Sequence, residues 1–238
     1  MNHLKLLIIL GRPASGKSEI VDYLNRLDPL ERQEKFHIAE MDILDDFPML
    51  WIWFEEDHIL SRKLGKPRLY TDEQGYFKHH YLWCLLIERL VLEYHKRLRE
   101  IPAYHERYTT IIEFSRGSEH GGYKEAFLNL SEDVLVNAGI VYVNVPYEES
   151  LRKNRQRFNP TRPYSILEHS LPDEKLERLY RDDDWRELTS GNKDFLTIQS
   201  IQVPYTVFDN ADDVVAGDIL KLPTRLESVL GQLWDLRR

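Results

Sequence analysis

The segment Gly11–Ser18, GRPASGKS, constrains the fold of this chain more than any other stretch. Its pattern is a glycine, four further residues, a second glycine, a lysine and a serine. An almost unbroken apolar run, KLLIIL, precedes it at 5–10. Apolar residues follow it at helical spacing, at positions 20, 21, 24 and 27. The sequence therefore predicts a buried parallel strand, a tight loop and a helix in direct succession.

The residue types of this loop are those that bind phosphate. Glycines permit the tight turn, and the backbone N–H groups and the positive end of the helix then face one point. In such a loop Lys17 reaches the β- and γ-phosphates, and the Ser18 hydroxyl binds Mg²⁺. We therefore expect ATP and Mg²⁺ as cofactors and assign the whole loop to nucleotide binding: Gly11, Arg12, Pro13, Ala14, Ser15, Gly16, Lys17 and Ser18.

Composition and charge limit the other classes of function. The chain has 238 residues, of which 42% are hydrophobic and 30% charged, as in an ordinary globular protein. Its net charge of −8 repels nucleic acid, so a polynucleotide partner is not expected. The single cysteine, Cys84, forms no internal disulfide, and no apolar stretch has the length of a membrane span or a signal peptide. We expect a soluble cytoplasmic protein; the sequence does not indicate its oligomeric state.

Strand and helix patterns alternate along the chain and predict an α/β fold. Short apolar runs predict strands at 5–10, 35–41, 109–114, 139–145 and 203–208. Helical patterns lie between them, the longest at 76–99. This alternation favours one domain over residues 1–238, built on a doubly wound parallel sheet with right-handed crossovers.

Acidic residues follow two of the predicted strands. Asp42 comes directly after the second strand, with Asp45 and Asp46 close behind, and Glu113 lies near the end of the third. The carboxyl ends of parallel strands share the sheet edge on which the phosphate loop opens. Asp42 and Glu113 are therefore both candidate bases, and Glu113 is, with Ser18, a candidate Mg²⁺ ligand. The alternative for each is a solvated carboxylate at the end of a strand.

Arginines form the second set of candidates. Arg116 follows Glu113 by three residues and has the geometry to clamp a polar substrate, or else to pair with Glu113 or a neighbouring acid. Arg152 and Arg155 share one face of a predicted helix and could reach a transferring phosphoryl group, with Arg157 or Arg162 extending the patch. The alternative for this second group is a solvated basic face.

Four segments together resemble the nucleoside and nucleotide kinase group of phosphate-loop proteins: GRPASGKS, the acidic strand ends, EFSRG at 113–117 and PYEESLRKNRQRF at 146–158. The resemblance implies a three-layer α/β/α fold with five parallel strands in the order 2-3-1-4-5. It also implies a helical insertion at about 43–101 that binds the phosphoryl acceptor, and an arginine-rich lid at about 147–190.

The same resemblance suggests roles for individual residues. Arg152, Arg155 and Arg157 look like lid arginines, and Asn210 lies in a turn where such enzymes contact adenine. Glu113 with Arg116 is similar to the Glu-Arg pair of deoxynucleoside kinases, although Phe114 and Ser115 intervene here. Asp42 looks like the acidic residue that activates the acceptor hydroxyl in small-molecule kinases.

These observations favour a kinase that transfers the γ-phosphoryl group of ATP to a small molecule, with a nucleoside or nucleotide favoured as acceptor. The DGFPR pattern of adenylate kinases is absent, so the acceptor itself stays open. The alternative is a nucleotide-dependent switch or ATPase module without a small-molecule acceptor.

Overall fold

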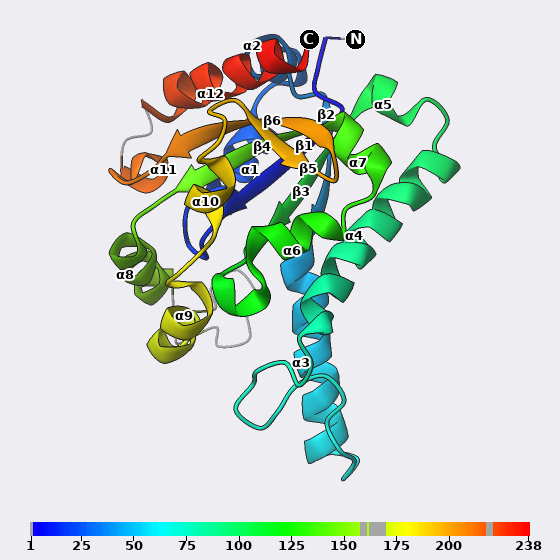
Figure 1. Ribbon diagram of the computed structural model, residues 1–238, viewed down its shortest axis with the longest axis vertical. Helices are drawn as coiled ribbons and strands as arrows, with labels where there is room; N and C mark the ends of the chain where they lie inside the picture. Colours follow the sequence, from blue (N-terminus) through cyan, green and yellow to red (C-terminus); the bar gives the residue numbers. More distant parts are fainter. Residues whose placement is uncertain (1, 158–160, 162–169, 218–220) are drawn as a thin grey trace.

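Six strands form a single sheet in the order β2-β3-β1-β4-β6-β5. The computed structural model describes residues 2–157, 161, 170–217 and 221–238 (Figure 1). The strands are β1 (Leu6–Gly11), β2 (Glu40–Asp45), β3 (Tyr108–Phe114), β4 (Ala138–Asn144), β5 (Phe195–Ile198) and β6 (Ile201–Asp209). All neighbouring strands pair in parallel except β5, which runs antiparallel to β6 at the edge.

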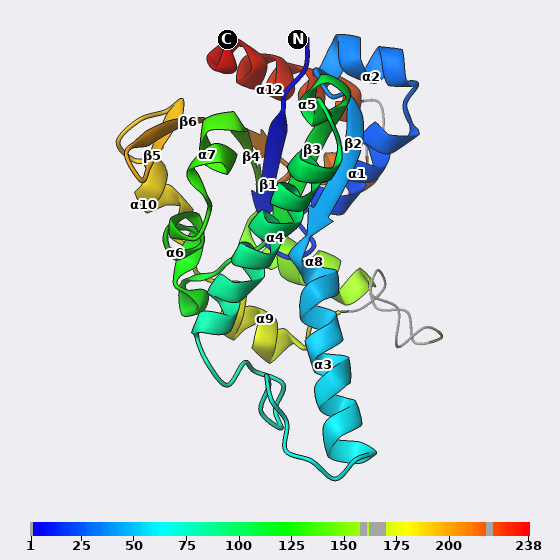
Figure 2. The ribbon, with the colours of Figure 1, turned by 90° about the vertical axis from the view of Figure 1, so that its right-hand side faces the viewer.

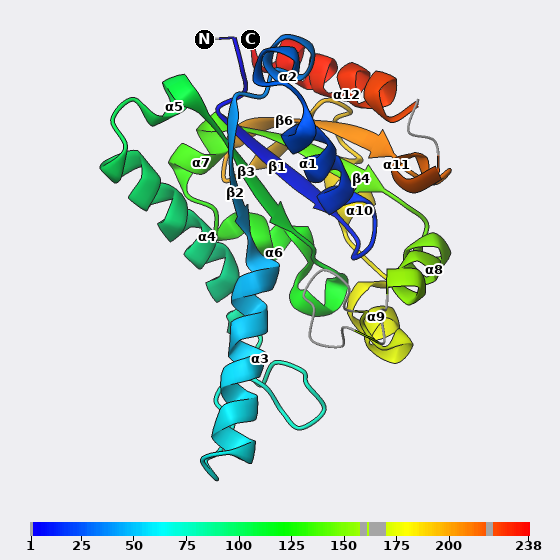
Figure 3. The ribbon, with the colours of Figure 1, turned by 180° about the vertical axis from the view of Figure 1, so that it is seen from behind.

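Helices cover both faces of this sheet because its central strand is apolar on both sides. Leu6, Ile8 and Leu10 of β1 pack into one buried cluster, and Leu7 and Ile9 pack into another. This alternation is the two-residue period of a strand. The first cluster contains side chains of the helices within residues 81–100, 122–137 and 185–189, and the second those of the helices within 17–36 and 221–237. The ribbon shows these helices around the sheet (Figures 1 and 3).

The helices of the described residues differ widely in length. They are α1 (Lys17–Arg26), α2 (Pro29–Phe36), α3 (Asp46–Arg62), α4 (Tyr81–Glu100), α5 (Tyr104–Arg107), α6 (Gly122–Leu128), α7 (Glu132–Asn137), α8 (Tyr147–Arg157), α9 (Asp173–Tyr180), α10 (Trp185–Thr189), α11 (Val214–Gly217) and α12 (Lys221–Arg237), with a 3₁₀ turn at Ser118–His120. Among the residues described, none of these helices combines the length and the apolar character that crossing a membrane requires.

The structure differs from the predicted sheet in two places: one strand is added and one is shifted. The sheet has six strands rather than five, because the four-residue strand β5 pairs with β6 through a tight turn in which Gln199 and Ser200 adopt positive φ. The second strand is also wrong: residues up to Phe36 belong to α2, whose first turn is capped by Asp28. The strand itself begins at Glu40 and ends at Asp45. The helix predicted at 76–99 begins later, at Tyr81.

A long arm formed by α3, residues 63–80 and the first turns of α4 extends beyond the sheet (Figures 1 and 2). Asp57 of α3 holds the connecting segment in place. Its buried carboxylate accepts hydrogen bonds from the N–H groups of Leu69, Tyr70 and Thr71 and from the Thr71 hydroxyl, at 2.5–3.3 Å. Burial alone would raise the pKa of Asp57, but these hydrogen bonds lower it below its usual value.

We expect Asp57→Ala to lower the free energy of unfolding by about 3 kcal/mol, because it leaves buried N–H groups without an acceptor. The control is Asp22→Ala, which removes an exposed ion pair with Arg26 and should change stability by less than about 0.5 kcal/mol. Denaturant unfolding measures both. Since the folded-state pKa of Asp57 is depressed, its contribution is present above the unfolded pKa of about 3.9 and is lost as the pH falls further. Equal stabilities of the two variants at neutral pH would contradict the role of Asp57.

Candidate functional site

The loop between β1 and α1 has a conformation that only glycine can adopt at two positions. Gly11 has φ +153° and Gly16 has φ +105°. A Cβ atom at Gly11 would lie 2.7 Å from the Val143 carbonyl oxygen, and one at Gly16 would lie 2.7 Å from Asn210 Nδ2. The first N–H groups of α1 have no acceptor within the helix, and Gly16 has no side chain that could cap them. They are therefore free to bind an anion.

Residues distant in the sequence fix the backbone of this loop. Asn210 Nδ2 donates to the Ser15 carbonyl oxygen at 2.8 Å, and Ser150 Oγ donates to that of Pro13 at 2.7 Å. Asn210 is fully buried. These contacts show that Asn210 positions the loop; its predicted contact with adenine stays a prediction.

Arg12 ties the loop to the segment that follows α9. Its guanidinium donates to the carbonyl oxygens of Val145, Tyr180 and Arg181 and forms an ion pair with Asp183 at 2.8 Å. Arg12 belongs to the loop but does not line the cavity that the loop borders. We infer that Arg12 orders the loop rather than contacting a phosphate.

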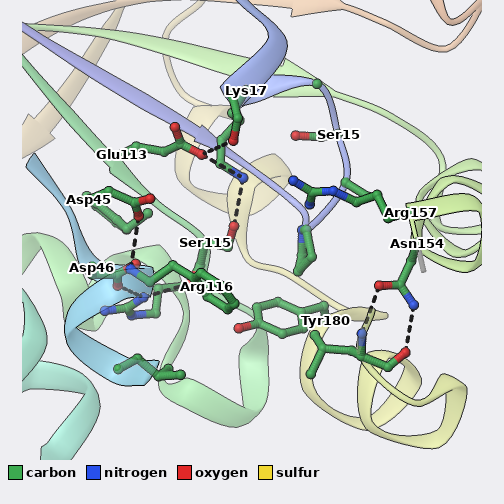
Figure 4. A pocket seen from close by; sticks show the side chains of 18 of the residues that line it. Ser15, Lys17, Asp45, Asp46, Glu113, Ser115, Arg116, Asn154, Arg157 and Tyr180 are labelled. Atoms are coloured by element: carbon green, nitrogen blue, oxygen red, sulfur yellow. Dashed lines mark hydrogen bonds and ion pairs between the residues drawn. The ribbon is translucent and has the colours of Figure 1, made fainter. Parts of the chain in front are cut away.

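Lys17 is buried at the open side of the loop (Figure 4). Its Nζ donates to the carbonyl oxygens of Gly11 and Arg12, both at 3.2 Å, and to Ser115 Oγ at 2.8 Å. Glu113 Oε1 lies 3.9 Å away. Burial lowers the pKa of Lys17, and the nearby Glu113 carboxylate opposes that shift. The amino group of Lys17 is therefore held against the loop carbonyl oxygens, between the loop and Ser115.

Three carboxylates stand beside this lysine. The parallel register of β2 and β3 places Asp45 opposite Glu113, and Asp46 follows as the first residue of α3. Ser18 Oγ donates to Glu113 Oε1 at 3.3 Å. Burial raises the pKa of Asp45 to about 7, with repulsion from Glu113 and Asp46 adding to the effect. Burial also raises the pKa of Glu113, against the opposing charge of Lys17.

Arg116 is paired with one of these acids. Its NH1 donates to Asp46 Oδ2 at 2.6 Å, and its NH2 donates to the Trp83 carbonyl oxygen at 3.1 Å. Both side chains are almost fully buried, and burial raises the pKa of Asp46 in spite of the ion pair. Of the two predicted alternatives for Arg116, these contacts favour an ion pair with a neighbouring acid, at the wall of the cavity.

Asp42 lies outside the site. It is in the middle of β2, opposite Thr110, and its carboxylate accepts from Arg97 Nε at 3.1 Å and from the Tyr104 hydroxyl at 2.9 Å. The sequence prediction placed the strand end too early, so the carboxylate that reaches the sheet edge is Asp45. In the sequence, Asp45 and Asp46 were also candidates for the acid at the end of the strand. Only the register of β2 against β3 shows that Asp45, and not Asp42, lies opposite Glu113.

Two of the predicted lid arginines also point elsewhere. Arg152 pairs with Glu149 and Asp213, and Arg155 pairs with Asp173. Both are about half exposed or more, with exposed fractions of 45% and 61%. Arg157 instead lines the cavity beside the loop. Arg162 lies outside the described residues.

Two adjoining cavities open at this edge of the sheet. The first, of about 160 Å³, is lined by the loop, the three carboxylates, Arg116, Asn154 and Arg157. The second, of about 470 Å³, lies between α3, residues 68–80 and α9. The two share part of their lining, namely Phe47, Leu50, Trp83, Leu171 and Tyr180.

The donor set fits Mg²⁺ in the presence of phosphate. No group of three or more His, Cys, Asp or Glu side chains in the described part of the chain is arranged to hold a metal ion by itself. Mg²⁺ is typically bound by one or two protein oxygens together with phosphate oxygens and water. Ser18 Oγ and Glu113 Oε1 are such a pair, and the mutual repulsion of Asp45, Asp46 and Glu113 would be relieved by a divalent cation here.

Comparisons with known proteins give only weak likenesses. Neither the family models nor the curated proteins contain a match. The chain is similar to the solved structure of APE1195, with 14% identity over 97% of this chain and 98% of that chain and a TM-score of 0.41. It is similar to an unliganded sugar kinase from Janibacter sp. HTCC2649, with 13% identity over 98% of both chains and a TM-score of 0.43. Both TM-scores are below 0.5, so these likenesses do not indicate a function for this chain.

We expect Asp45→Asn to stabilise the protein without ligands at about pH 8. The raised pKa of Asp45 means that the native state disfavours its charge, so the penalty is absent below about pH 4 and complete above about pH 7. Asparagine removes the charge and retains the helix cap to the Phe47 N–H. We expect Tm to rise by about 2–4 °C per kcal/mol of relief at about pH 8 and to be nearly unchanged at about pH 4.

The control for this experiment is Asp42→Asn, which removes an ion pair with Arg97 and should give no rise in Tm. Thermal unfolding followed by circular dichroism measures all three proteins. A lower Tm for Asp45→Asn at about pH 8 would contradict the conclusion that the native state disfavours the charged form of Asp45.

Proposed function

We propose that this protein is an ATP- and Mg²⁺-dependent phosphotransferase that transfers the γ-phosphoryl group to a hydroxyl of a small molecule. One observation carries the proposal: a phosphate-type loop with a buried lysine stands next to Asp45, whose pKa is raised to about 7, at the entrance to a second cavity. The second cavity supplies a place for an acceptor next to the loop, which a hydrolase or switch does not require.

The roles follow from the contacts described above. The N–H groups of the loop and Lys17 would hold the phosphates, and Ser18 and Glu113 would hold Mg²⁺. ATP would supply the phosphoryl group, and the bound cation would neutralise part of its charge. Asp45 would accept the proton of the attacking hydroxyl, a task that suits a carboxylate whose pKa lies near neutrality.

The acids around the loop favour a hydroxyl over a phosphate as the attacking group. Asp45, Asp46 and Glu113 lie within one cavity, and Arg116 is already paired with Asp46. An acceptor phosphate would bring further negative charge against these carboxylates in a site of low dielectric. A neutral hydroxyl avoids this repulsion and gives Asp45 a proton to accept.

The direct test incubates the protein with γ-labelled ATP, Mg²⁺ and a panel of hydroxyl compounds, including nucleosides, sugars and aromatic alcohols. We expect label on one class of acceptor, and a loss of at least a hundredfold in Lys17→Met, because the lysine stabilises charge on the transferring group. Circular dichroism checks that the variant is folded. Full transfer by Lys17→Met would overturn the proposal. ATP hydrolysis that no acceptor stimulates would favour a switch or ATPase instead.

The pH dependence tests the role of Asp45. We expect the transfer rate at saturating acceptor to fall as the pH drops below about 7, because protonation removes the base. Asp45→Asn should lose about 10²–10⁴-fold in rate and the pH dependence with it. Asp42→Asn, three residues earlier on the same strand, should retain both. A rate that is lost in Asp42→Asn and kept in Asp45→Asn would contradict the assignment.

A further inference from the structure

The second cavity, called the aromatic chamber below, has walls of two kinds. Seven aromatic side chains line it: Phe47, Trp51, Phe54, Tyr76, Phe77, Trp83 and Tyr180. Charged side chains stand around them: Arg68, Glu73, His80, Glu119, Lys175 and Arg178. A pocket of about 470 Å³ with this lining is large enough for a small organic ligand.

The aromatic wall is exposed to the cavity rather than used by the core. Phe47, Trp51 and Phe54 are spaced by four and three residues, which puts them on one face of α3. All three are only half-buried, whereas Trp53, on another face of the same helix, is buried and stacks on Tyr70 at 5.1 Å. Half-buried rings that line one wall of a cavity are suited to contact a planar ring.

Two cations of the chamber have no acidic partner. Arg68 donates to the carbonyl and hydroxyl oxygens of Thr71, and Lys175 Nζ donates to the Gly75 carbonyl oxygen at 3.2 Å. Neither forms an ion pair with any residue that the structure describes, whereas Arg178 pairs with Glu119 at 2.7 Å. Carbonyl groups orient these side chains without neutralising them. Burial lowers the pKa of Lys175, and the charges of Asp72 and Glu174 oppose that shift from a distance.

The segment that carries these groups is held in a fixed conformation. Asp57 binds the backbone of residues 69–71, and Thr71 pairs with Phe77 in a β-bridge. Arg68 and the Gly75 carbonyl that holds Lys175 thus belong to one ordered turn. The chamber is therefore formed before a ligand enters, which reduces the ordering cost of binding.

Charge is distributed unequally between the two cavities. The lining of the first cavity has the acids Glu19, Asp45, Asp46 and Glu113 against Lys17, Arg116 and Arg157, whereas the chamber has Arg68, Lys175 and Arg178 against Glu73 and Glu119. This balance favours an acidic substituent in the chamber over one beside Asp45 and Asp46. This arrangement would orient an acidic acceptor with its charged group in the chamber and its other end toward the loop.

We propose that the aromatic chamber binds an acceptor that combines a planar ring with an acidic group, carboxylate or phosphate. The ring lies among the aromatic side chains, the acidic group faces Arg68 and Lys175, and the hydroxyl of the same molecule faces Asp45. This inference rests on the proposed phosphotransferase function and specifies its acceptor class.

The binding test uses matched probes and the fluorescence of Trp51 and Trp83, and it needs no nucleotide. The reference probe is 4-(hydroxymethyl)benzoate, with 4-(hydroxymethyl)phenylphosphonate to separate carboxylate from phosphate-type recognition. The neutral 4-(hydroxymethyl)benzamide lacks the charge, and 4-(hydroxymethyl)cyclohexanecarboxylate lacks the planar ring. We expect at least one aromatic acid to bind about tenfold more tightly than both the amide and the saturated acid.

The variants assign that preference to the two cations. In the double variant Arg68→Gln, Lys175→Gln the preference for the aromatic acid over the amide should vanish. The control, Lys63→Gln with Lys66→Gln, removes the same charge from exposed positions just before Arg68 that do not line the chamber, and should keep it. Equal binding of acid and amide by the natural protein, equal binding of the saturated acid, or no binding of any aromatic acid would each overturn the proposal.

The binding test and the phosphoryl-transfer test can succeed or fail independently of each other. Lys17→Met should bind the aromatic acid as the natural protein does, since Lys17 does not line the chamber. If the aromatic acids bind as expected but no hydroxyl compound is phosphorylated, the phosphotransferase proposal fails and the binding site stands. If phosphoryl transfer occurs only to neutral or non-aromatic hydroxyl compounds, the acceptor class is wrong and the reaction stands.

Discussion

Lys17 carries a positive charge into a site nearly closed to solvent, and Glu113, Asp45 and Asp46 are buried around it. Burial of charge is expensive unless partners are close, so every element that contributes one of these groups must be positioned accurately. The register of β2 against β3 sets the two strand-end acids side by side, and Arg116 neutralises the third. Acids and cations thus alternate around the loop, an arrangement in which a divalent cation could lie against Glu113 and phosphates against Lys17.

Distant segments of the chain meet to hold the loop that presents this lysine. Ser150 of α8, Asn210 after β6 and the segment after α9 all bind the loop or its arginine. A loop that is rigid before it binds anion loses little entropy on binding. The same contacts hold α8 and α9 beside the loop. Arg157 of α8 and Tyr180 of α9 therefore line the first cavity.

The arm made by α3, residues 63–80 and the start of α4 gives the site its second half. Its conformation depends on one buried carboxylate, Asp57, that replaces secondary structure as the acceptor for three backbone N–H groups. The arm places aromatic rings and cations a short way from the phosphate loop, in a cavity that shares walls with the first. The sheet thus positions the loop and the acids beside it, and the arm forms the wall of the second cavity.

The sequence by itself determined the elements that are stabilised by residues close together in the chain. A buried apolar strand, a glycine-rich turn and an amphipathic helix predicted the β1–α1 junction, and strands β3, β4 and β6 lie within a residue or two of their expected positions. Tertiary structure alone decided the rest: Asp45 rather than Asp42 at the sheet edge, Arg152 and Arg155 paired away from the cavity, and strand β5. Each of these depends on strand register or on a partner distant in the chain, which neighbouring residues do not encode.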